Sequence, residues 1–542
     1  MENAGKIRIT FGNNNFFATF GNEACIKEVL DLTPVRVNSG CRGNGACGLC
    51  KIKILNDHVP EPTVTEQYHL TAKELNNAVR LACQVVPVSG MHIQVINAAQ
   101  FFGSSVIRPT DYYMKKAFFP VSDVPRDKKH GKYGLSVDLG STNISAVLWD
   151  LYENKRISGR RILNKQAQFG SDVITRIVAA NESGANAHRL SELALETIGN
   201  VIYDICSQDG YNPFEISAVS IVGNTAELAL LCGRNYENLL YPKNWVKKIE
   251  CACKDKSPWT YKWCINPNAL IEIVPPVGGF IGSDLSAGVL ATDMAKPGKC
   301  CLLLDFGTNT EIALWDGSIL WVTSAAGGPA FEGCGLSSGI PAGPGAIYKI
   351  DASNNSPDFI CHTIFSEWQS RQPKGICGSG IVDLIALLLD ADIITSKGKF
   401  NHFQTNSYEL RTGAGEFTLT KRDIDLFMRS KAAIGTGIGF LLKSSGVVAE
   451  EIDHIYICGA FGKNLNIPNA IKIGLLPVVN PNIIDLCGNT ALAGCEMLLI
   501  SSKSREKLEL IKQKTNLINM ANEPEFDMFY RENLFLRPME VS

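Results

Sequence analysis

An internal repeat is the feature that most constrains how this 542-residue chain folds. Residues 134–149 read Gly-Leu-Ser-Val-Asp-Leu-Gly-Ser-Thr-Asn-Ile-Ser-Ala-Val-Leu-Trp, and residues 301–315 read Cys-Leu-Leu-Leu-Asp-Phe-Gly-Thr-Asn-Thr-Glu-Ile-Ala-Leu-Trp. Each copy has an apolar run, an Asp-x-Gly turn with hydroxyl or amide side chains, and a second apolar run. A single Asp-x-Gly turn is common in hairpins. Two copies 167 residues apart instead predict a duplicated α/β lobe.

The turn of each copy has the composition of a phosphate clamp. Glycine permits a tight turn in which successive backbone N–H groups converge on one anion. The carboxylates of Asp138 and Asp305 can hold Mg²⁺ directly or through water. Two clamps that face each other across a cleft would grip the phosphates of ATP. The remaining candidate phosphate-binding residues are Gly140, Ser141, Thr142, Gly307, Thr308 and Asn309.

Three other stretches are candidates for the same site. In residues 455–464 a strand enters a turn with Gly459 and Gly462, where glycine lets a base and ribose approach the main chain. Gly378 and Ser379 precede an apolar helix, either as a tight entry into it or as donors of N–H groups to phosphate. Glu332 follows another glycine-rich turn, where it either orients an attacking water or caps a helix.

A second constellation of residues lies near the N-terminus. Cys41, Cys47 and Cys50 share a glycine-rich loop, and Cys83 completes the spacing C-x5-C-x2-C-x32-C. The plant-type [2Fe–2S] spacing is C-x4-C-x2-C…C, so the first gap here is wider. Zinc also takes four cysteines, usually as two separated C-x2-C pairs. The pattern therefore favours a [2Fe–2S] cluster over zinc or a structural thiol cluster.

The other thiols and the overall charge limit the remaining interpretations. Cys251, Cys253 and Cys264 lie close in sequence but lack a clear fourth ligand, so we interpret them as loop thiols.

A net charge of −2 gives no broad basic surface for nucleic acid or anionic lipid. The N-terminus has no apolar signal region, and no apolar run is long enough to span a bilayer. We expect a cytoplasmic protein with neither a nucleic-acid nor a membrane partner.

Changes in composition and residue pattern along the chain predict its domains. Residues 1–97 contain short strands around the cysteine loop, and residues 98–131 form an aromatic-rich linker. We expect the two lobes to cover residues 132–297 and 298–542. The linker is either an ordered connection or an arm that contacts a second subunit.

Both halves of the chain resemble known families. Residues 1–97 resemble the β-grasp fold of [2Fe–2S] ferredoxins, in which Leu-Ala-Cys-Gln around Cys83 is the usual setting of the fourth ligand. Residues 133–500 resemble the acetate and sugar kinase/Hsc70/actin superfamily, which has two ribonuclease H-like lobes with ATP between them. Glycines 459 and 462 match its adenosine segment. The whole chain resembles the reductive activators of corrinoid proteins.

This resemblance implies an ATP-dependent reductase of anaerobic methyltransferase systems. Electrons would enter at the cysteine cluster, and closure of the lobes on ATP would drive reduction of an inactive Co(II) corrinoid to Co(I). No D-x-H-x-x-G stretch occurs in the chain, so the corrinoid would belong to a separate methyltransferase protein. An electron-donating reductase or ferredoxin and a homodimer are also implied. The methyl donor, the electron donor and the cluster potential stay open.

Two functions from other classes also remain open. A small-molecule kinase with a redox-regulatory ferredoxin module would need a carboxylate poised as base for its acceptor. A redox-sensing module would bind ATP without turning it over. Assays of acceptor phosphorylation and of ATP turnover distinguish these functions from the first.

Overall fold

The structure is a computed structural model of the chain. It describes residues 5–12, 14–21, 23–31, 33, 35–37, 41, 43–98, 104–107, 123, 131–170, 172–253, 255–307, 309–327, 329–332, 336–343, 345–352, 359–364, 372–401, 406–412, 415–462 and 464–539. The aromatic residues of the predicted linker lie outside these ranges. In the described part of the chain, no helix is both long enough and apolar enough to cross a membrane.

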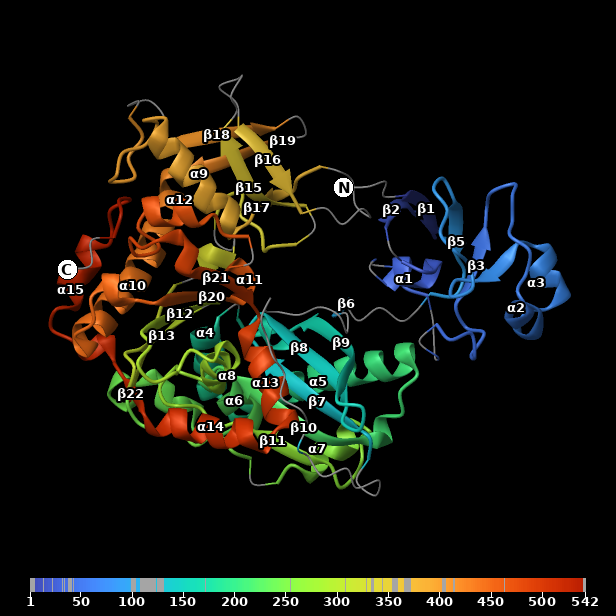
Figure 1. Cartoon of the computed structure of the whole chain (residues 1–542), viewed down its shortest axis with the longest axis horizontal. Helices are drawn as coiled ribbons and strands as arrows, with labels where there is room; N and C mark the ends of the chain where they lie inside the picture. Colours follow the sequence, from blue (N-terminus) through green and yellow to red (C-terminus); the bar gives the residue numbers. More distant parts are fainter. Residues whose placement is uncertain are drawn as a thin grey trace.

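The N-terminal domain is a mixed sheet flanked by short helices, as expected for a β-grasp fold (Figure 1). Its strand order is β2-β1-β5-β3-β4, with β1 parallel to β5 and antiparallel to β2. A capping box starts α3, where Thr71 and Glu74 exchange hydrogen bonds. The elements are β1 (Gly5–Phe11), β2 (Asn14–Phe20), α1 (Ile26–Asp31), β3 (Lys51–Ile54), α2 (Val64–His69), α3 (Ala72–Asn76), β4 (Val79–Leu81) and β5 (His92–Val95).

The first lobe is an α/β layer built on the first copy of the repeat. Its sheet has the order β11-β10-β7-β8-β9-β6, in which β7, β8 and β9 are antiparallel neighbours and β10 and β11 run parallel to β7. Its elements are β6 (Ser105–Val106), β7 (Tyr133–Leu139), β8 (Asn143–Asp150), β9 (Lys155–Leu163), α4 (Val173–Glu182), α5 (Gly184–Asp209), β10 (Ile216–Gly223), α6 (Thr225–Cys232), α7 (Ser257–Lys262), β11 (Leu270–Ile273) and α8 (Ser283–Thr292).

The second lobe repeats this topology, so the predicted duplication is confirmed. Its sheet has the order β21-β20-β12-β13-β14-β22, again with an antiparallel trio and parallel neighbours. The elements of the repeated sheet and its helices are β12 (Cys301–Phe306), β13 (Thr310–Trp315), β14 (Leu320–Ala325), α10 (Lys421–Ser445), β20 (His454–Cys458), α11 (Gly459–Gly462), β21 (Ile484–Gly488), α13 (Thr490–Ile500), α14 (Ser502–Gln513), β22 (Thr515–Leu517) and α15 (Phe526–Glu532).

An added subdomain sits at the end of the second lobe that lies farthest from the first lobe (Figure 1). It contains β15 (Ala346–Ala352), β16 (Phe359–Thr363), β17 (Gly375–Ile376), α9 (Gly378–Asp390), β18 (Ser407–Thr412), β19 (Gly415–Thr420) and α12 (Ile467–Lys472). Thr420 and Asp423 form a capping box at the start of α10. The apolar side of this long helix packs against β13 and β14 in the core of the second lobe.

Helix α13 joins the two lobes. It follows β21 of the second sheet, yet it packs against α8, β7 and β10 of the first lobe. The helices α13 and α8 approach closely, because a Cβ atom on Gly494 would lie 2.0 Å from the carbonyl oxygen of Ala287. Farther along, Glu496 accepts hydrogen bonds from Arg156 and Trp149 of the first lobe. The chain therefore changes lobes at the turn before α13.

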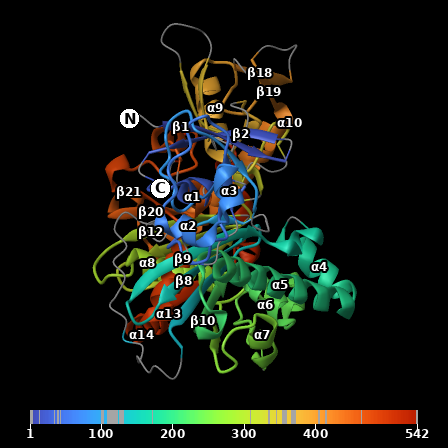
Figure 2. The ribbon, with the colours of Figure 1, turned by 90° about the vertical axis from the view of Figure 1, so that its right-hand side faces the viewer.

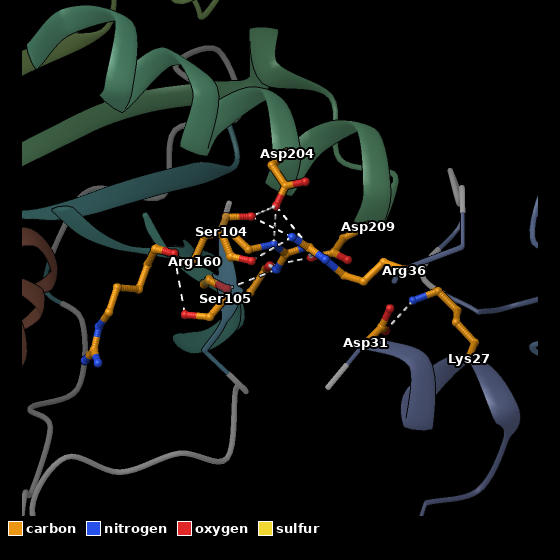
Figure 3. Close-up of polar contacts among 11 residues, drawn as sticks. Lys27, Asp31, Arg36, Ser104, Ser105, Arg160, Asp204 and Asp209 are labelled. Carbon is orange, nitrogen blue, oxygen red and sulfur yellow. Dashed lines mark hydrogen bonds and ion pairs between the residues drawn. The ribbon is translucent and has the colours of Figure 1, made fainter. Parts of the chain in front are cut away.

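The ferredoxin domain rests on the first lobe through a group of buried charges (Figures 1, 2 and 3). Arg36 reaches Asp204 near the end of α5 with an Nη1–Oδ2 distance of 3.1 Å. The same oxygen accepts from Arg160 Nε at 2.7 Å and from Ser104 Oγ at 2.8 Å. Arg36, Ser104, Arg160 and Asp204 thus lie in a buried polar contact between the two domains, which we call the ferredoxin seat.

Candidate functional site

The two Asp-x-Gly turns lie at equivalent ends of the two central strands. Asp138 is the second-to-last residue of β7, and Asp305 is at the matching position of β12. In the first turn the carbonyl of Gly140 accepts from Asn164 Nδ2 at 3.0 Å. In the second, the N–H of Gly307 donates to the carbonyl of Asn309 at 3.0 Å. Ser141 and Thr142 lie in the first turn, whereas Thr308 is outside the described residues.

The structure brings Asp138 and Asp305 together with two further carboxylates. Burial raises the pKa of Asp305 to about 7, and the charge of Asp138 adds to the shift. Burial also raises the pKa of Asp284 to about 8, with contributions from the charges of Asp305 and Asp138. The pKa of Glu311 is raised well above its ordinary value by burial and by Asp284 and Asp305. These four residues come from both lobes, and we use the name carboxylate cleft for the group.

The negative charge of the carboxylate cleft is offset mainly by hydrogen bonds from side-chain amide groups. Asn489 Nδ2 donates to Asp138 Oδ2 at 2.7 Å, and Asn224 Nδ2 lies 3.3 Å from Glu311 Oε1. Burial raises the pKa of Asp138, while the bond from Asn489 and the charge of Arg161 lower it. Repulsion among ionised carboxylates is thus left largely unopposed. A cation bound there would relieve it.

The residue set fits a Mg²⁺ ion that is held jointly with phosphate. Within the described ranges, no group of three or more His, Cys, Asp or Glu side chains is arranged to hold a metal ion by itself. Mg²⁺ characteristically takes only one or two protein carboxylates and fills its remaining positions with water and substrate phosphates. Partly buried carboxylates without a cation partner match that requirement.

The other predicted glycines lie near the carboxylate cleft or in the scaffold behind it. Gly459 has φ +85°, and a Cβ atom there would lie 2.2 Å from the carbonyl of Phe306 and 3.1 Å from Asp305 Oδ1. This close approach places the start of α11 against the second turn. A Cβ atom on Gly462 would instead meet Ile457 within β20, at 2.7 Å.

Gly378 and Ser379 have contacts that suit the scaffold interpretation. A Cβ atom on Gly378 would lie 2.0 Å from the carbonyl of Phe331. The Ser379 hydroxyl donates to the carbonyl of Tyr348 at 2.7 Å, and the side chain is buried. Glu332 ends a short 3-10 helix, Pro329–Glu332, and its side chain is outside the described residues.

Four functional candidates in the carboxylate cleft were not singled out from the sequence. Asp284 and Asn224 occur in glycine-containing stretches after apolar runs, which is a weak signal. Glu311 stands opposite Asp305 across the β12–β13 ladder, so the register of the hairpin would have located it. Asn489 is 351 residues from Asp138 and carries no local signal.

The four predicted cluster cysteines fall into two pairs. Cys41 interacts with the Cys47 side chain, and Cys50 interacts with Cys83. The bond from Cys50 lowers the pKa of Cys83 to about 6. Two irons with two thiolates each would match two pairs, whereas one zinc ion needs four thiolates around a single point.

The backbone of the cysteine loop also suits an anionic cluster. Gly43, Gly45 and Gly48 have φ values of +91°, +78° and +66°, which glycine adopts readily. Backbone N–H groups of Gly43 and Ala46 point to Cys41, and that of Gly45 points to Cys83. The loop therefore directs hydrogen-bond donors at the sulfur atoms.

The fold and these two sites define a class of protein, a two-lobed ATPase of the acetate and sugar kinase/Hsc70/actin type joined to a [2Fe–2S] ferredoxin domain. Residues 299–542 match the C-terminal ASKHA domain of RACo, residues 133–297 match the RACo middle region, and residues 18–88 match a 2Fe-2S iron-sulfur cluster binding domain. The chain belongs to the RACo family of corrinoid activation enzymes.

Named relatives share most of the chain. It is 31% identical over 430 residues to "Corrinoid activation enzyme RamQ" of Eubacterium limosum, covering 75% of this chain and 71% of that protein. It is 27% identical to "[Co(II) methylated amine-specific corrinoid protein] reductase" of Methanosarcina barkeri, covering 73% and 76%. The solved structure of "Reductive activator for corrinoid,iron-sulfur protein" aligns over 99% of both chains with a TM-score of 0.64 and 24% identity, which shows the shared fold.

Proposed function

We propose that this protein is an ATP-dependent reductive activator that reduces the inactive Co(II) corrinoid of a partner methyltransferase protein to Co(I). The observation that carries the proposal is the carboxylate cleft. Its Asp138 and Asp305 come from different lobes, and the charge of Asp138 raises the pKa of Asp305. Such a cleft binds a cation with an anionic ligand, and the same chain holds a thiol site for electrons. The relatives' names supply the acceptor.

Asp138 and Asp305 would hold Mg²⁺·ATP between the lobes, with the turns around Gly140 and Gly307 facing the phosphates. A cation held by these residues would offset the repulsion between the two carboxylates. That change favours approach of the lobes, so nucleotide binding selects a closed conformation. Gly459 would leave room for the nucleotide beside Asp305.

Cys41, Cys47, Cys50 and Cys83 would hold a [2Fe–2S] cluster, which supplies one-electron transfer when bound. An external reductase or ferredoxin would load it. The inferred setting is a reducing cytoplasm, where the remaining thiols stay reduced. Resemblance to the family also leads us to propose a homodimer.

Within the first lobe, strand β9 connects the proposed nucleotide site to the ferredoxin seat. Strand β9 carries Arg160, which binds Asp204 in the seat. The strand ends at Leu163, and the next residue, Asn164, donates to the Gly140 carbonyl at 3.0 Å. A shift of the Gly140 turn on nucleotide binding would therefore act on the strand that supports the ferredoxin domain.

The experiment is an anaerobic assay of Co(I) formation with reduced holoprotein and a Co(II) corrinoid protein, with and without Mg²⁺·ATP. Co(I) has its own absorption spectrum, so the product is read directly. We expect Co(I) to accumulate only with ATP. Equal Co(I) with and without ATP would refute the activator function. Phosphorylation of a small acid or alcohol in a parallel screen would support the kinase function instead.

A further inference from the structure

We propose that Asn489 is a positioning residue of the nucleotide site, which fixes the Asp138 carboxylate and ties it to the second lobe. The inference rests on the proposed function, because it concerns the carboxylate assigned there to Mg²⁺·ATP. The Asn489 amide makes two hydrogen bonds. The residue lies at the turn where the chain changes lobes, between β21 and α13.

The orientation of the Asn489 amide is determined by its partners on both sides. Its Oδ1 accepts the backbone N–H of Leu492 at 2.8 Å and thereby caps the N-terminus of α13. Its Nδ2 must then face the other way, where it donates to Asp138 Oδ2 at 2.7 Å. An acceptor-only side chain could make the first bond but not the second.

The bond to Asp138 crosses between the lobes. Strand β21 is hydrogen-bonded to β20 in the second sheet, while α13 packs on the first lobe. Asn489 therefore stands at the joint of the segment that must bend when the lobes move. The hydrogen bond from Asn489 to Oδ2 therefore fixes the orientation in which the Asp138 carboxylate would meet a bound cation.

The equivalent carboxylate of the second lobe has no such support. Among the described residues, no side chain donates a hydrogen bond to Asp305, and its neighbour on that side is Gly459. Asp138 is thus the anchored member of the pair and Asp305 the adjustable one. Anchoring one carboxylate before the ligand arrives reduces the reorganisation that binding requires.

The test separates the two bonds of Asn489 by substitution. Asn489→Asp keeps a side chain that caps helices well but replaces the donor with an acceptor, and Asn489→Ser keeps a shorter cap that cannot reach Asp138. The matched control is Asn466→Ala, which removes a cap of the same type from α12. Each holoprotein is titrated with Mg²⁺·ATP by calorimetry, and its thermal midpoint and steady-state ATPase rates are measured.

We expect both Asn489 variants to bind Mg²⁺·ATP at least about tenfold more weakly than wild type, the scale of a lost hydrogen bond to a charged group. The loss should appear in KM more than in kcat, and Asn489→Ser should lower the thermal midpoint no more than Asn466→Ala does, because it keeps a helix cap. Asn466→Ala should lower the midpoint and leave nucleotide affinity unchanged. Wild-type affinity in both Asn489 variants overturns the proposal. Failure of the wild-type protein to bind ATP would instead refute the proposed function.

Discussion

The ferredoxin seat and the carboxylate cleft are both groups of partly or fully buried charges, but they are balanced in opposite ways. The seat contains Lys27, Arg36 and Arg160 against Asp31, Asp204 and Asp209, so its formal charges cancel (Figure 3). The cleft gathers four carboxylates against amides and one more distant arginine.

The pKa shifts record this difference. Burial alone would lower the pKa of Arg160, but Asp209 and Asp204 raise it above its ordinary value. At Asp284, Asp305 and Glu311 in the cleft, burial and the charges of neighbouring carboxylates act in the same direction, and both raise the pKa of the carboxyl group. Charges that satisfy one another hold domains together, whereas charges left without partners mark a place for a missing ligand.

Removing a cleft carboxylate should have the largest effect on activity. Asp305→Asn should reduce ATP-dependent Co(I) formation at least about 100-fold, as expected when one electrostatic group leaves a preorganised site. The apo variant should be at least as stable as wild type, because it loses a repulsive charge. Activity and thermal unfolding are measured on the same sample, and the paramagnetic resonance spectrum of the reduced cluster serves as the control. Loss of that spectrum would mean that Asp305 acts through the fold.

Removing a carboxylate from the ferredoxin seat should instead affect stability more than activity. Asp204→Asn removes the carboxylate that Arg36 and Arg160 share. Arg160 keeps Asp209, but the buried Arg36 loses its carboxylate, and breaking such a group costs about 3–5 kcal/mol. Denaturant unfolding of the apo protein measures this loss. A variant as stable as wild type would contradict the view that the seat is a structural ion network.

Arg36→Ala should be milder than Asp204→Asn, because Asp204 keeps Arg160 and Ser104. We expect the ferredoxin domain to leave its seat without unfolding. Hydrogen exchange near the C-terminal end of α5 should rise, while exchange within β1 and β5 stays slow. The control is Arg8→Ala, which changes an exposed arginine of the same domain. Unchanged exchange in α5 would show that Arg36 does not hold the domain in place.

The smallest expected effect is a pH dependence of stability. Asp305 and Asp284 have folded pKa values of about 7 and about 8, above the ordinary carboxyl range, so the folded apo protein binds more protons than the unfolded chain. Their contribution to stability is complete below the unfolded pKa and is lost as pH rises through 7 and 8. The thermal midpoint of the apo protein should therefore fall between pH 6 and pH 8.

Mg²⁺·ATP should reduce that fall, and Asp305→Asn should flatten it. Scanning calorimetry in matched buffers gives both comparisons. A midpoint that rises with pH in the apo protein would contradict the assignment of raised pKa values to the cleft.

Much of the fold was predictable because its signals are local. The Asp-x-Gly repeat predicted two lobes, and the cysteine loop carried glycines that adopt positive φ in the structure. The pairing of Asp138 with Asp305 followed from the duplication, since equivalent strands end at equivalent places. No local pattern pointed to Asn489 as a member of the site or to Arg36 and Asp204 as partners, and the signal for Asp284 was weak.

By itself the sequence determined the elements, their duplication and the chemistry of the candidate ligands, because periodicity and turn chemistry act over a few residues. Only the tertiary structure decided which charges are balanced. Arg36 meets Asp204 across 168 residues, and Asn489 meets Asp138 across 351. Such contacts depend on how lobes and domains pack, and that packing leaves the seat neutral and the cleft in need of a cation.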